Sequence, residues 1–378
     1  MMQILVVNSD AAVRHCLLQW LDAAEYDITF WDEDPRALDL THLSEPLLII
    51  GDWQQASATD DLSLWQSWKE HPDTPPLFCL MLVAADRLAD VMPALSAGVD
   101  DWLAYPLDEV TLRARLLACQ QVLQLRQDLQ AQKAQLQAEL AEAEAYVRSL
   151  LPQDLTKKVP INARFIPSSS LGGDCYDFYW LDPDYLVIYL LDVSGHGLGS
   201  ALLSTSVLNM LRSQALPDVN FYRPEKVLQA LNDTFQMNDQ NEKYFTMWYG
   251  VYNRANRQLM YTSAGHPPAV LISPQTGQKH SVEPLKTPGL PIGMLPDVQY
   301  SWNRCEIPPG SRLYLFSDGV YEIKQWDNTI MGLEDFIEIL STHDLSESID
   351  EILMQVSRRA QEHTTFSDDL SLLEVYLD

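Results

Sequence analysis

Short apolar runs and amphipathic stretches alternate through the first 118 residues of the chain. The apolar runs predict four buried strands, at Gln3–Val7, Pro46–Asp52, Pro76–Val83 and Asp100–Pro106. Amphipathic stretches such as Ala12–Leu21 and Arg87–Ser96 predict helices between these strands. Strands that alternate with helices indicate an α/β doubly wound domain, in which helices cover both faces of a parallel sheet.

A single long helix is predicted next, from Leu107 to about Leu150. This segment contains no proline or glycine, and it is rich in Leu, Gln, Ala and Glu, which favour helices. Apolar positions repeat every seven residues at Val122, Leu129, Leu136, Ala143 and Leu150. A companion set is Leu112, Cys119, Leu140 and Val147, interrupted by Arg126 and Lys133. The pattern predicts a coiled-coil linker over residues 119–150 that joins two chains into a homodimer. The alternative is one helix packed on its own chain.

Strands dominate the remainder of the chain, from about Leu151 to Asp378. Apolar runs predict strands at Tyr185–Leu191, Tyr244–Asn253, Gln258–Gly265, Ala269–Ser273, Arg312–Asp318 and Leu370–Leu377. Helical stretches near Ala201–Ala215 and Pro224–Asn238 interrupt them. This order predicts an α+β domain built mostly from antiparallel sheet. The whole chain is therefore expected to be multidomain, with boundaries at 1–118, 119–150 and 151–378.

Composition narrows the classes of function. The formal net charge of −28 disfavours nucleic-acid binding, because no basic patch offsets it. An acidic excess fits either simple solubility or clustered acids that bind divalent cations. The five cysteines have no metal-type spacing, the N-terminus has no basic leader, and no apolar run approaches the ~20 residues that a bilayer requires. These features predict a cytoplasmic protein without membrane contact.

Aspartates occur repeatedly at predicted strand ends in the third segment. Asp174 and Asp177 lie in "GGDCYD", Asp192 in "LLDVSGHGLG", Asp318 in "FSDGV", and Asp368 with Asp369 in "FSDDLSLL". An aspartate beside glycine at a strand end is often only part of a turn. If these acids converge, however, they cannot all stay ionised without a compensating cation. Oxygen-only ligands favour Mg²⁺ or Mn²⁺, and two such ions can activate water and hold a phosphoryl group.

Six motifs in residues 151–378 resemble bacterial PPM (PP2C-type) serine phosphatases of the SpoIIE/RsbU class. They are "LGGDCYDFY", "LLDVSGHGLGSAL", "YTSAGHPPAVLI", "PGLPIG", "LFSDGVYE" and "DDLSLL", and they occur in the order typical of that class. The resemblance implies a PP2C-type β-sandwich flanked by helices that holds two Mn²⁺ or Mg²⁺ ions. It also implies direct hydrolysis of phosphoserine or phosphothreonine, without a phosphoenzyme, on a STAS-domain anti-sigma-factor antagonist.

The resemblance also assigns roles to individual residues. Asp192 would bridge both ions, with the Val193 carbonyl beside it, and Asp174 would hold one ion directly or through water. Asp318 and Asp368 would hold the other ion. Asp177 and Asp369 would support the surrounding loops. His196 is either a general acid or a residue that packs the loop, and His266 is expected to be structural because prolines fix a turn after it.

The first segment resembles the response-regulator receiver domain over residues 1–120, through "ILVV", "LLIIGDW" and "SAGVDDWLAYPL". Asp52 falls at the phospho-acceptor position of that family. The family's supporting groups are replaced by Asn8, Ser9, Val83 and Tyr105, although Asp10 could restore a weak metal site. Without those groups, transferring phosphoryl charge is poorly stabilised. We therefore expect a degenerate receiver that serves as a docking or dimer-setting module.

The sequence thus favours a metal-dependent protein serine/threonine phosphatase that is regulated through its N-terminal domain. The alternative is a non-catalytic scaffold that binds a phosphorylated partner. The set of acids in the third segment argues against the scaffold, because binding alone does not require metal-facing carboxylates.

Overall fold

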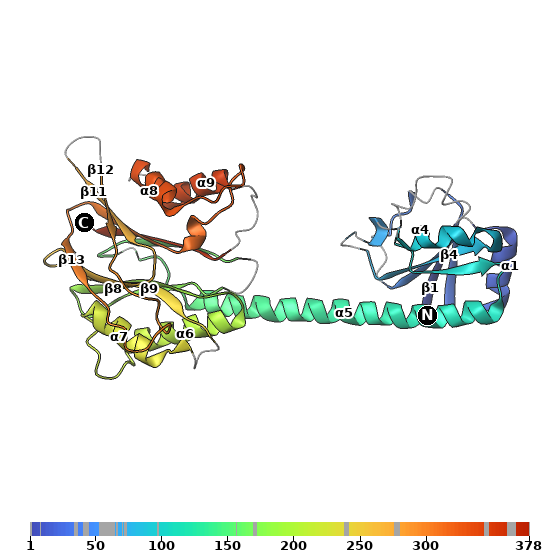
Figure 1. The fold of residues 1–378 in the computed structure, drawn as a ribbon, viewed down its shortest axis with the longest axis horizontal. Coiled ribbons are helices and arrows are strands. Elements are labelled where there is room, and N and C mark those ends of the chain that lie inside the picture. The colour runs from blue at the N-terminus through green and yellow to red at the C-terminus, as the bar shows by residue number, and fades with distance from the viewer. Residues whose placement is uncertain are drawn as a thin grey trace. The chain divides into compact units, whose positions relative to one another are not determined.

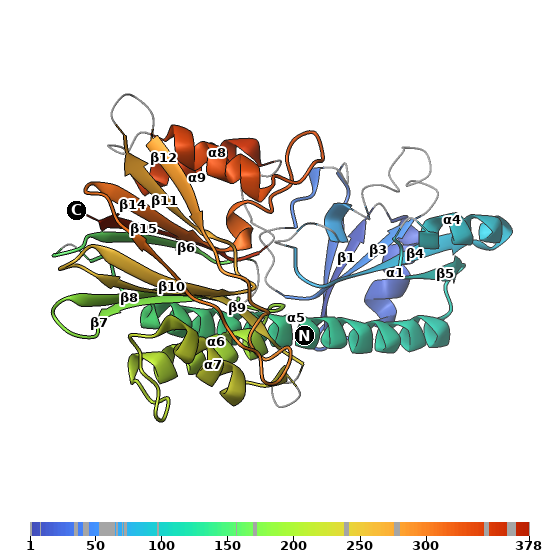
Figure 2. The same cartoon turned by 60° about the vertical axis from the view of Figure 1, so that its left-hand side comes forward.

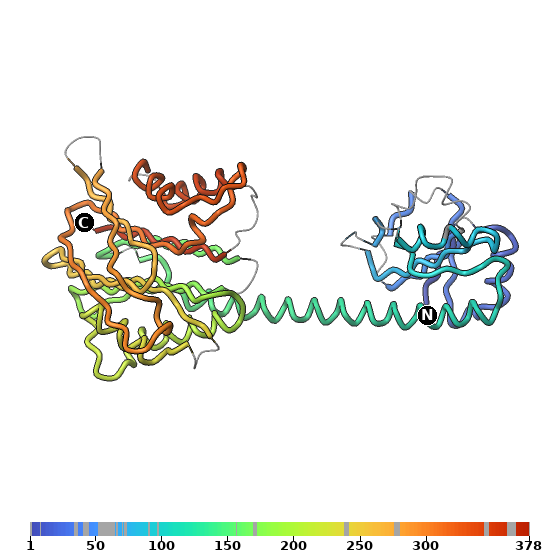
Figure 3. Tube along the Cα trace, viewed as in Figure 1, coloured from blue at the N-terminus to red at the C-terminus, as the bar shows by residue number. Residues whose placement is uncertain are grey.

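The chain folds into two compact units, Met1–Glu139 and Leu140–Asp378 (Figures 1 and 3). The computed structural model describes residues 2–7, 9–33, 37–40, 45–52, 65, 67–69, 71, 74–96, 98–155, 157–168, 172–237, 242–275, 280–343, 348–360 and 368–377. The division between the units falls within one continuous helix, α5 (Glu109–Leu150), which confirms the long helix predicted from Leu107 to Leu150.

The N-terminal unit contains a five-stranded parallel sheet with the strand order β2-β1-β3-β4-β5. Its strands are β1 (Met2–Val7), β2 (Tyr26–Trp31), β3 (Leu47–Asp52), β4 (Leu77–Ala84) and β5 (Asp101–Tyr105). Helix α1 (Ala11–Trp20) and the start of α5 pack on one face, through residues such as Leu17 and Leu116. Helix α4 (Val91–Ser96), which follows the 3-10 segment Ala85–Asp90, packs on the other face. The expected α/β layout with helices on both faces is present.

The first turns of α5 belong to the core of this unit. Leu112 and Cys119, which we expected in the companion seam of a coiled coil, are fully buried against the sheet instead. Arg126 interrupts that seam for a physical reason, because its Nη2 lies 2.7 Å from Oδ1 of the nearly buried Asp100. The buried core extends along α5 as far as Leu123, which is beyond the boundary expected at residue 118.

The C-terminal unit contains two antiparallel five-stranded sheets. The first has the order β13-β10-β9-β8-β7 and the second has the order β12-β11-β14-β15-β6. The strands of the first sheet are β7 (Cys175–Trp180), β8 (Tyr185–Val193), β9 (Phe245–Asn253), β10 (Gln258–Ala264) and β13 (Asn303–Glu306). Those of the second are β6 (Ile161–Ile166), β11 (Ala269–Pro274), β12 (His280–Leu285), β14 (Ser311–Phe316) and β15 (Leu370–Leu377).

The two sheets stack into a sandwich with helices on both outer faces (Figure 2). Residues such as Ile188, Trp248 and Leu373 fill the space between the sheets. Helices α6 (Leu198–Arg212) and α7 (Pro224–Thr234) cover the first sheet. Helices α8 (Leu333–Thr342) and α9 (Ile349–Arg359) cover the second sheet. The predicted β-sandwich flanked by helices is therefore present.

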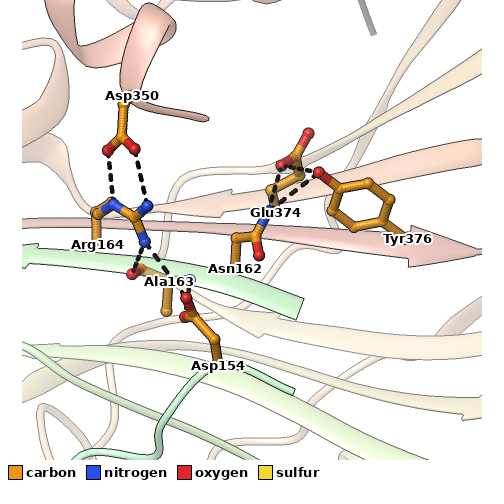
Figure 4. Close-up of polar contacts among 7 residues, drawn as sticks. All are labelled: Asp154, Asn162, Ala163, Arg164, Asp350, Glu374 and Tyr376. Carbon is orange, nitrogen blue, oxygen red and sulfur yellow. Dashed lines mark hydrogen bonds and ion pairs between the residues drawn. The ribbon is translucent and has the colours of Figure 1, made fainter. Parts of the chain in front are cut away.

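Polar side chains of the second sheet form hydrogen bonds with one another and an ion pair with α9 (Figure 4). The carboxylate of Glu374 is fully buried, and it accepts hydrogen bonds from the Tyr314 hydroxyl, the Tyr376 hydroxyl and Nδ2 of Asn162. Beside it, Arg164 of β6 forms a two-pronged ion pair with Asp350 of α9, with N···O distances of 2.6 and 2.9 Å. These contacts fix α9 to the sheet.

Within the described part of the chain, no helix combines the length and apolar character needed to cross a membrane.

Candidate active site

Asp192 lies at the end of β8, in the first sheet of the sandwich. Its strand pairs with β9 up to Val193 opposite Phe245, and Asp192 lies opposite Thr246. The chain then leaves the sheet through Gly195 and Gly197, whose φ angles are +73° and +93°. Side-chain-bearing residues rarely adopt these angles, so glycine permits the abrupt turn from β8 into α6.

Asp174 lies beside this strand end on the segment that leads into β7. The chain approaches so closely there that a Cβ atom on Gly173 would lie 2.5 Å from the Val193 carbonyl oxygen. A Cβ atom on Gly172 would likewise overlap the Asp369 carboxylate, at 1.3 Å from Oδ2. The two glycines before Asp174 therefore bring three distant parts of the chain together: the start of β7, the end of β8 and the start of β15.

Asp318 follows β14 and begins the 3-10 turn Asp318–Val320. Gly319 packs against the backbone of the Asp368–Asp369 segment, and a Cβ atom there would lie 2.1 Å from the Asp369 carbonyl oxygen. Asp369 is almost fully buried and accepts backbone hydrogen bonds from Ser168 (3.0 Å) and Asp174 (3.4 Å). Asp368 is exposed, and its Oδ1 accepts only a bond from the next backbone N–H among its described contacts.

The acids of these segments repel one another. Burial raises the pKa of Asp192 well above its usual range, and Asp318, Asp368 and Asp369 raise it further. Burial and then the Asp192 charge raise the pKa of Asp174 well above its usual range. Burial, followed by the Asp368 charge, raises the pKa of Asp318 to about 6. The close packing at Gly172, Gly173 and Gly319 brings the segments that carry these acids together at one end of the sandwich, and the mutual repulsion agrees with that arrangement.

The donor set suits a hard divalent cation. Oδ2 of Asp174 is buried and has no hydrogen-bond partner among the described residues. A buried carboxylate oxygen without a donor is costly, and a cation in contact with it removes that cost. Within the described residues, no three His, Cys, Asp or Glu side chains already form a metal-holding group. The acids are therefore close enough to interact, but their side chains do not form a closed cage.

The remaining predicted residues of this unit lie elsewhere. Asp177 is 2% exposed and forms an ion pair with Nε of Arg212 at 2.8 Å. Arg212 is the last residue of α6, whereas the glycine turn precedes its first residue. The support that we expected it to give to the metal-binding loop is therefore not direct. His196 is exposed in the turn between β8 and α6. His266 is buried, its Nδ1 lies 2.8 Å from Oγ1 of Thr246, and burial lowers its pKa to about 3.

In the N-terminal unit, the carboxyl ends of the five parallel strands all lie at the same end of the sheet. Asn8 and the side chain of Asp52 lie outside the described residues. Oδ1 of Asp10 accepts the Val13 backbone N–H at 2.7 Å, which caps α1 and commits this carboxylate to a structural contact. Val83 is 1% exposed and belongs to the core, so it does not line an open crevice.

Two cations, one beside the glycine turn and one at the other end of α6, carried no sequence signal. Lys243 contacts the turn after β8, and Arg212 pairs with Asp177 across 35 positions of the chain. Neither lies in a spacing pattern that marks a site. Only the pairing of β8 with β9, and the packing of α6 on the first sheet, bring these cations to their partners.

A helix-flanked double sheet with converging acids at one end defines the PP2C class of phosphatase folds. Residues 182–378 match the model of the family described as Stage II sporulation protein E (SpoIIE). Because this match covers more than half of the 378 residues, the chain belongs to the SpoIIE family. Its C-terminal unit is a PP2C-type (PPM) phosphatase domain.

Curated relatives match different shares of the chain. "Phosphoserine phosphatase RsbP" of Bacillus subtilis (strain 168) is 32% identical over 178 residues, which are 46% of this chain and 42% of RsbP. The chain thus spans less than half the length of that relative. "Regulator of RpoS" of Escherichia coli (strain K12) is 25% identical over 307 residues, 78% of this chain and 88% of that protein.

Among solved structures, the SiaA-PP2C domain of Pseudomonas aeruginosa has a similar fold. The TM-score is 0.56 at 21% sequence identity, and the match covers 66% of this chain and 99% of that one. At this identity the likeness supports the fold of the C-terminal unit and nothing further.

Proposed function

We propose that this protein is a divalent-metal-dependent protein serine/threonine phosphatase. The observation that carries the proposal is the close packing of the acid-bearing segments at Gly172, Gly173 and Gly319, and the acids there raise one another's pKa values. RsbP, which is named a phosphoserine phosphatase, is 32% identical to this chain over 178 residues. Repelling carboxylates are unfavourable in a binding module and useful in a metal site.

Two Mn²⁺ or Mg²⁺ ions fit this donor set. Asp192, whose charge acts on Asp174 and is repelled by Asp318 and Asp368, would contact both ions, with the Val193 carbonyl beside it. Asp174 would hold one ion through its unpartnered Oδ2, and Asp318 with Asp368 would hold the other. The bound ions supply positive charge that activates water and stabilises the phosphoryl group. Asp369 keeps Asp174 in place through the backbone bonds that it accepts.

The substrate in this proposal is a phosphorylated signalling protein, and a STAS-type antagonist of an anti-sigma factor is the first candidate. The competing function is a scaffold that binds a phosphorylated partner without hydrolysing it. The likeness to the Regulator of RpoS supports this second function. The match extends across both units, and the name of that protein states no phosphatase activity.

Phosphate release separates the two functions. The purified full chain should release phosphate from a phosphoserine STAS protein when Mn²⁺ is present, and not when a chelator replaces Mn²⁺. Asp192→Asn should lower the rate by about 100-fold or more, because this acid is assigned to both ions. Asp184→Asn, at an exposed turn, is the matched control. Binding of the phosphoprotein without any Mn²⁺-dependent release would favour the scaffold.

We further propose that the N-terminal unit is a degenerate receiver that regulates the phosphatase through α5. Nη1 of Arg212, in the last turn of α6, donates to the carbonyl of Leu150, the final residue of α5, at 3.1 Å. The other end of α6 begins at the glycine turn beside Asp192. One helix therefore links the end of α5 to the candidate site.

Asp52 in this scheme is a poor phospho-acceptor, since the groups that stabilise phosphoryl transfer are absent. Incubation with Mg²⁺ and a small phosphoryl donor, followed by intact-mass measurement, should leave the chain unmodified. Stoichiometric addition of one phosphoryl group that Asp52→Asn abolishes would contradict this part of the proposal.

A further inference from the structure

Lys243 precedes β9 and contacts the turn that follows Asp192 and Val193. Its Nζ donates to the Ser194 carbonyl at 3.2 Å and to Oγ of Ser200 at 2.9 Å. The hydroxyl of Ser200 in turn donates to the Gly195 carbonyl at 2.9 Å. A single ammonium thus ties both carbonyls at the start of the turn to the first turn of α6, directly or through one hydroxyl.

The glycines of the turn contribute no side chains that could fix its shape. Gly195 and Gly197 have positive φ angles, and neither has a side chain to pack. No side chain caps the first turn of α6, because its N-cap is Gly197. Glycine residues lose the most conformational freedom on ordering, so such a turn needs contacts from outside to stay in one conformation.

Lys243 is placed for this purpose by the backbone itself. Beyond the last β8–β9 pair, the Ser194 N–H donates to the Tyr244 carbonyl at 2.9 Å, and the Tyr244 N–H donates to Oγ of Ser194 at 3.1 Å. These bonds continue the ladder by one residue and aim Lys243 across the turn. A Cβ atom on Gly199 would lie 3.0 Å from Cε of Lys243, so glycine there makes room for the lysine stem.

We propose that Lys243 is a positioning residue of the phosphatase site, which holds the Ser194–Gly199 turn so that Asp192 and the Val193 carbonyl stay aimed at the metal ions. The inference rests on the proposed metal-dependent function. Lys243 acts through the turn and does not itself touch the substrate. Its removal therefore lowers metal affinity and leaves substrate affinity unchanged once the ions are bound.

Three variants test this role. Lys243→Met keeps the stem over Gly199 and removes the ammonium, whereas Lys243→Arg keeps the charge and the donors. Lys226→Met, at an exposed position of α7, is the control. Isothermal titration with Mn²⁺ should show affinity about tenfold or more weaker for Lys243→Met, as is typical when a supporting contact of a metal ligand is lost. Lys243→Arg should recover most of the affinity, and Lys226→Met should match the unaltered chain.

Hydrogen exchange and kinetics supply independent readouts. Without metal, the amides of residues 194–200 should exchange several-fold faster in Lys243→Met than in the control. With p-nitrophenyl phosphate, the Mn²⁺ concentration for half-maximal rate should rise for Lys243→Met, while kcat and KM at saturating Mn²⁺ stay close to those of the unaltered chain.

The outcomes separate this inference from the proposed function. Unchanged Mn²⁺ affinity in Lys243→Met, or a raised KM at saturating Mn²⁺, would overturn the positioning role, and the latter would indicate contact with substrate. If the unaltered chain binds Mn²⁺ but releases no phosphate, the phosphatase proposal fails while the Mn²⁺ titration still decides the role of Lys243. If the unaltered chain binds no Mn²⁺, both fail.

Discussion

At the scale of single residues, two adjacent aspartates do different things. Asp369 is buried, and each of its two carboxylate oxygens accepts a backbone hydrogen bond, Oδ1 from Ser168 and Oδ2 from Asp174. Asp368 is exposed, and one of its oxygens accepts only the neighbouring N–H among the described contacts. The first residue shapes the site, whereas the second is free to bind an ion.

The raised carboxylate pKa values predict a pH dependence for the metal-free protein. The pKa values of Asp174, Asp192 and Asp318 lie above those of an unfolded aspartate, and that of Asp318 is about 6. The folded state therefore retains protons that the unfolded state releases. This contribution is fully present below about pH 4 and is lost as the pH rises through the folded values.

Without metal, we expect Asp174→Asn to raise the free energy of unfolding at pH 7.5 by on the order of 1 kcal/mol, and to change it little at pH 4. The same variant should lose most of the stabilisation that Mn²⁺ gives to the unaltered chain. Thermal unfolding at both pH values, with chelator and with Mn²⁺, measures this. A stability gain of equal size at both pH values would show that repulsion at residue 174 is not the cause.

Gly173 gives a second prediction at this scale. Alanine there would bring a methyl group to 2.5 Å from the Val193 carbonyl oxygen, which is backbone and cannot move aside. We expect Gly173→Ala to weaken Mn²⁺ binding by about tenfold or more while the fold survives. Gly332→Ala is a matched control, because the nearest atom to its new methyl group is a side-chain oxygen 3.7 Å away. Equal Mn²⁺ affinity in the two variants would contradict the close approach.

At the scale of elements, α6 joins two functional places. Its N-terminus begins at the turn beside Asp192, and Arg212 in its last turn contacts both Asp177 and the end of α5. Asp177 is buried, and Arg212 pairs with it at 2.8 Å. The pair thus fixes the position of α6 on the first sheet.

We expect Arg212→Met to lower the free energy of unfolding by about 3 kcal/mol, because it leaves a buried carboxylate unpaired. Asp177→Asn added to Arg212→Met should restore part of that loss, since no charge is then left behind. Urea unfolding of the two single variants and the double variant gives the coupling energy. Strict additivity would mean that the ion pair contributes nothing specific.

At the scale of the whole molecule, leucine side chains in the middle of α5 are exposed among the described residues. Leu129, Leu136 and Leu140 are 64%, 57% and 42% exposed. They belong to the seven-residue pattern that predicts a coiled coil, and a second copy of the chain is the partner that such a pattern favours.

We therefore expect the full chain to be dimeric at micromolar concentration, and Leu129→Lys with Leu136→Lys to make it monomeric, because each buried leucine contributes roughly 2 kcal/mol. Analytical ultracentrifugation measures the change. Ala131→Lys, on the helix face opposite the seam, should leave the dimer intact. A monomeric unaltered chain would favour the alternative of a single helix without a coiled-coil partner.

The strands that the apolar pattern did not predict share one place in their sheets. β2, β6, β7, β12 and β13 were not predicted, and all of them are edge strands of their sheets. An edge strand has a neighbour on one side only, so its sequence need not be a continuous apolar run. Helices α8 and α9 were missed as well. Their apolar positions make sense only against the outer face of the second sheet, which they cover.

The sequence by itself determined the interior strands of the three sheets, the long helix and the set of acids, because local backbone preferences and apolar periodicity are properties of neighbouring residues. It also marked Asp192 as a strand end with glycines beyond it. The tertiary structure alone decided that acids up to 195 positions apart meet, that Asp369 is spent on the backbone of Asp174, and that Lys243 and Arg212 serve the same helix. Those contacts arise from strand pairing and layer packing, which bring together residues that share no local pattern.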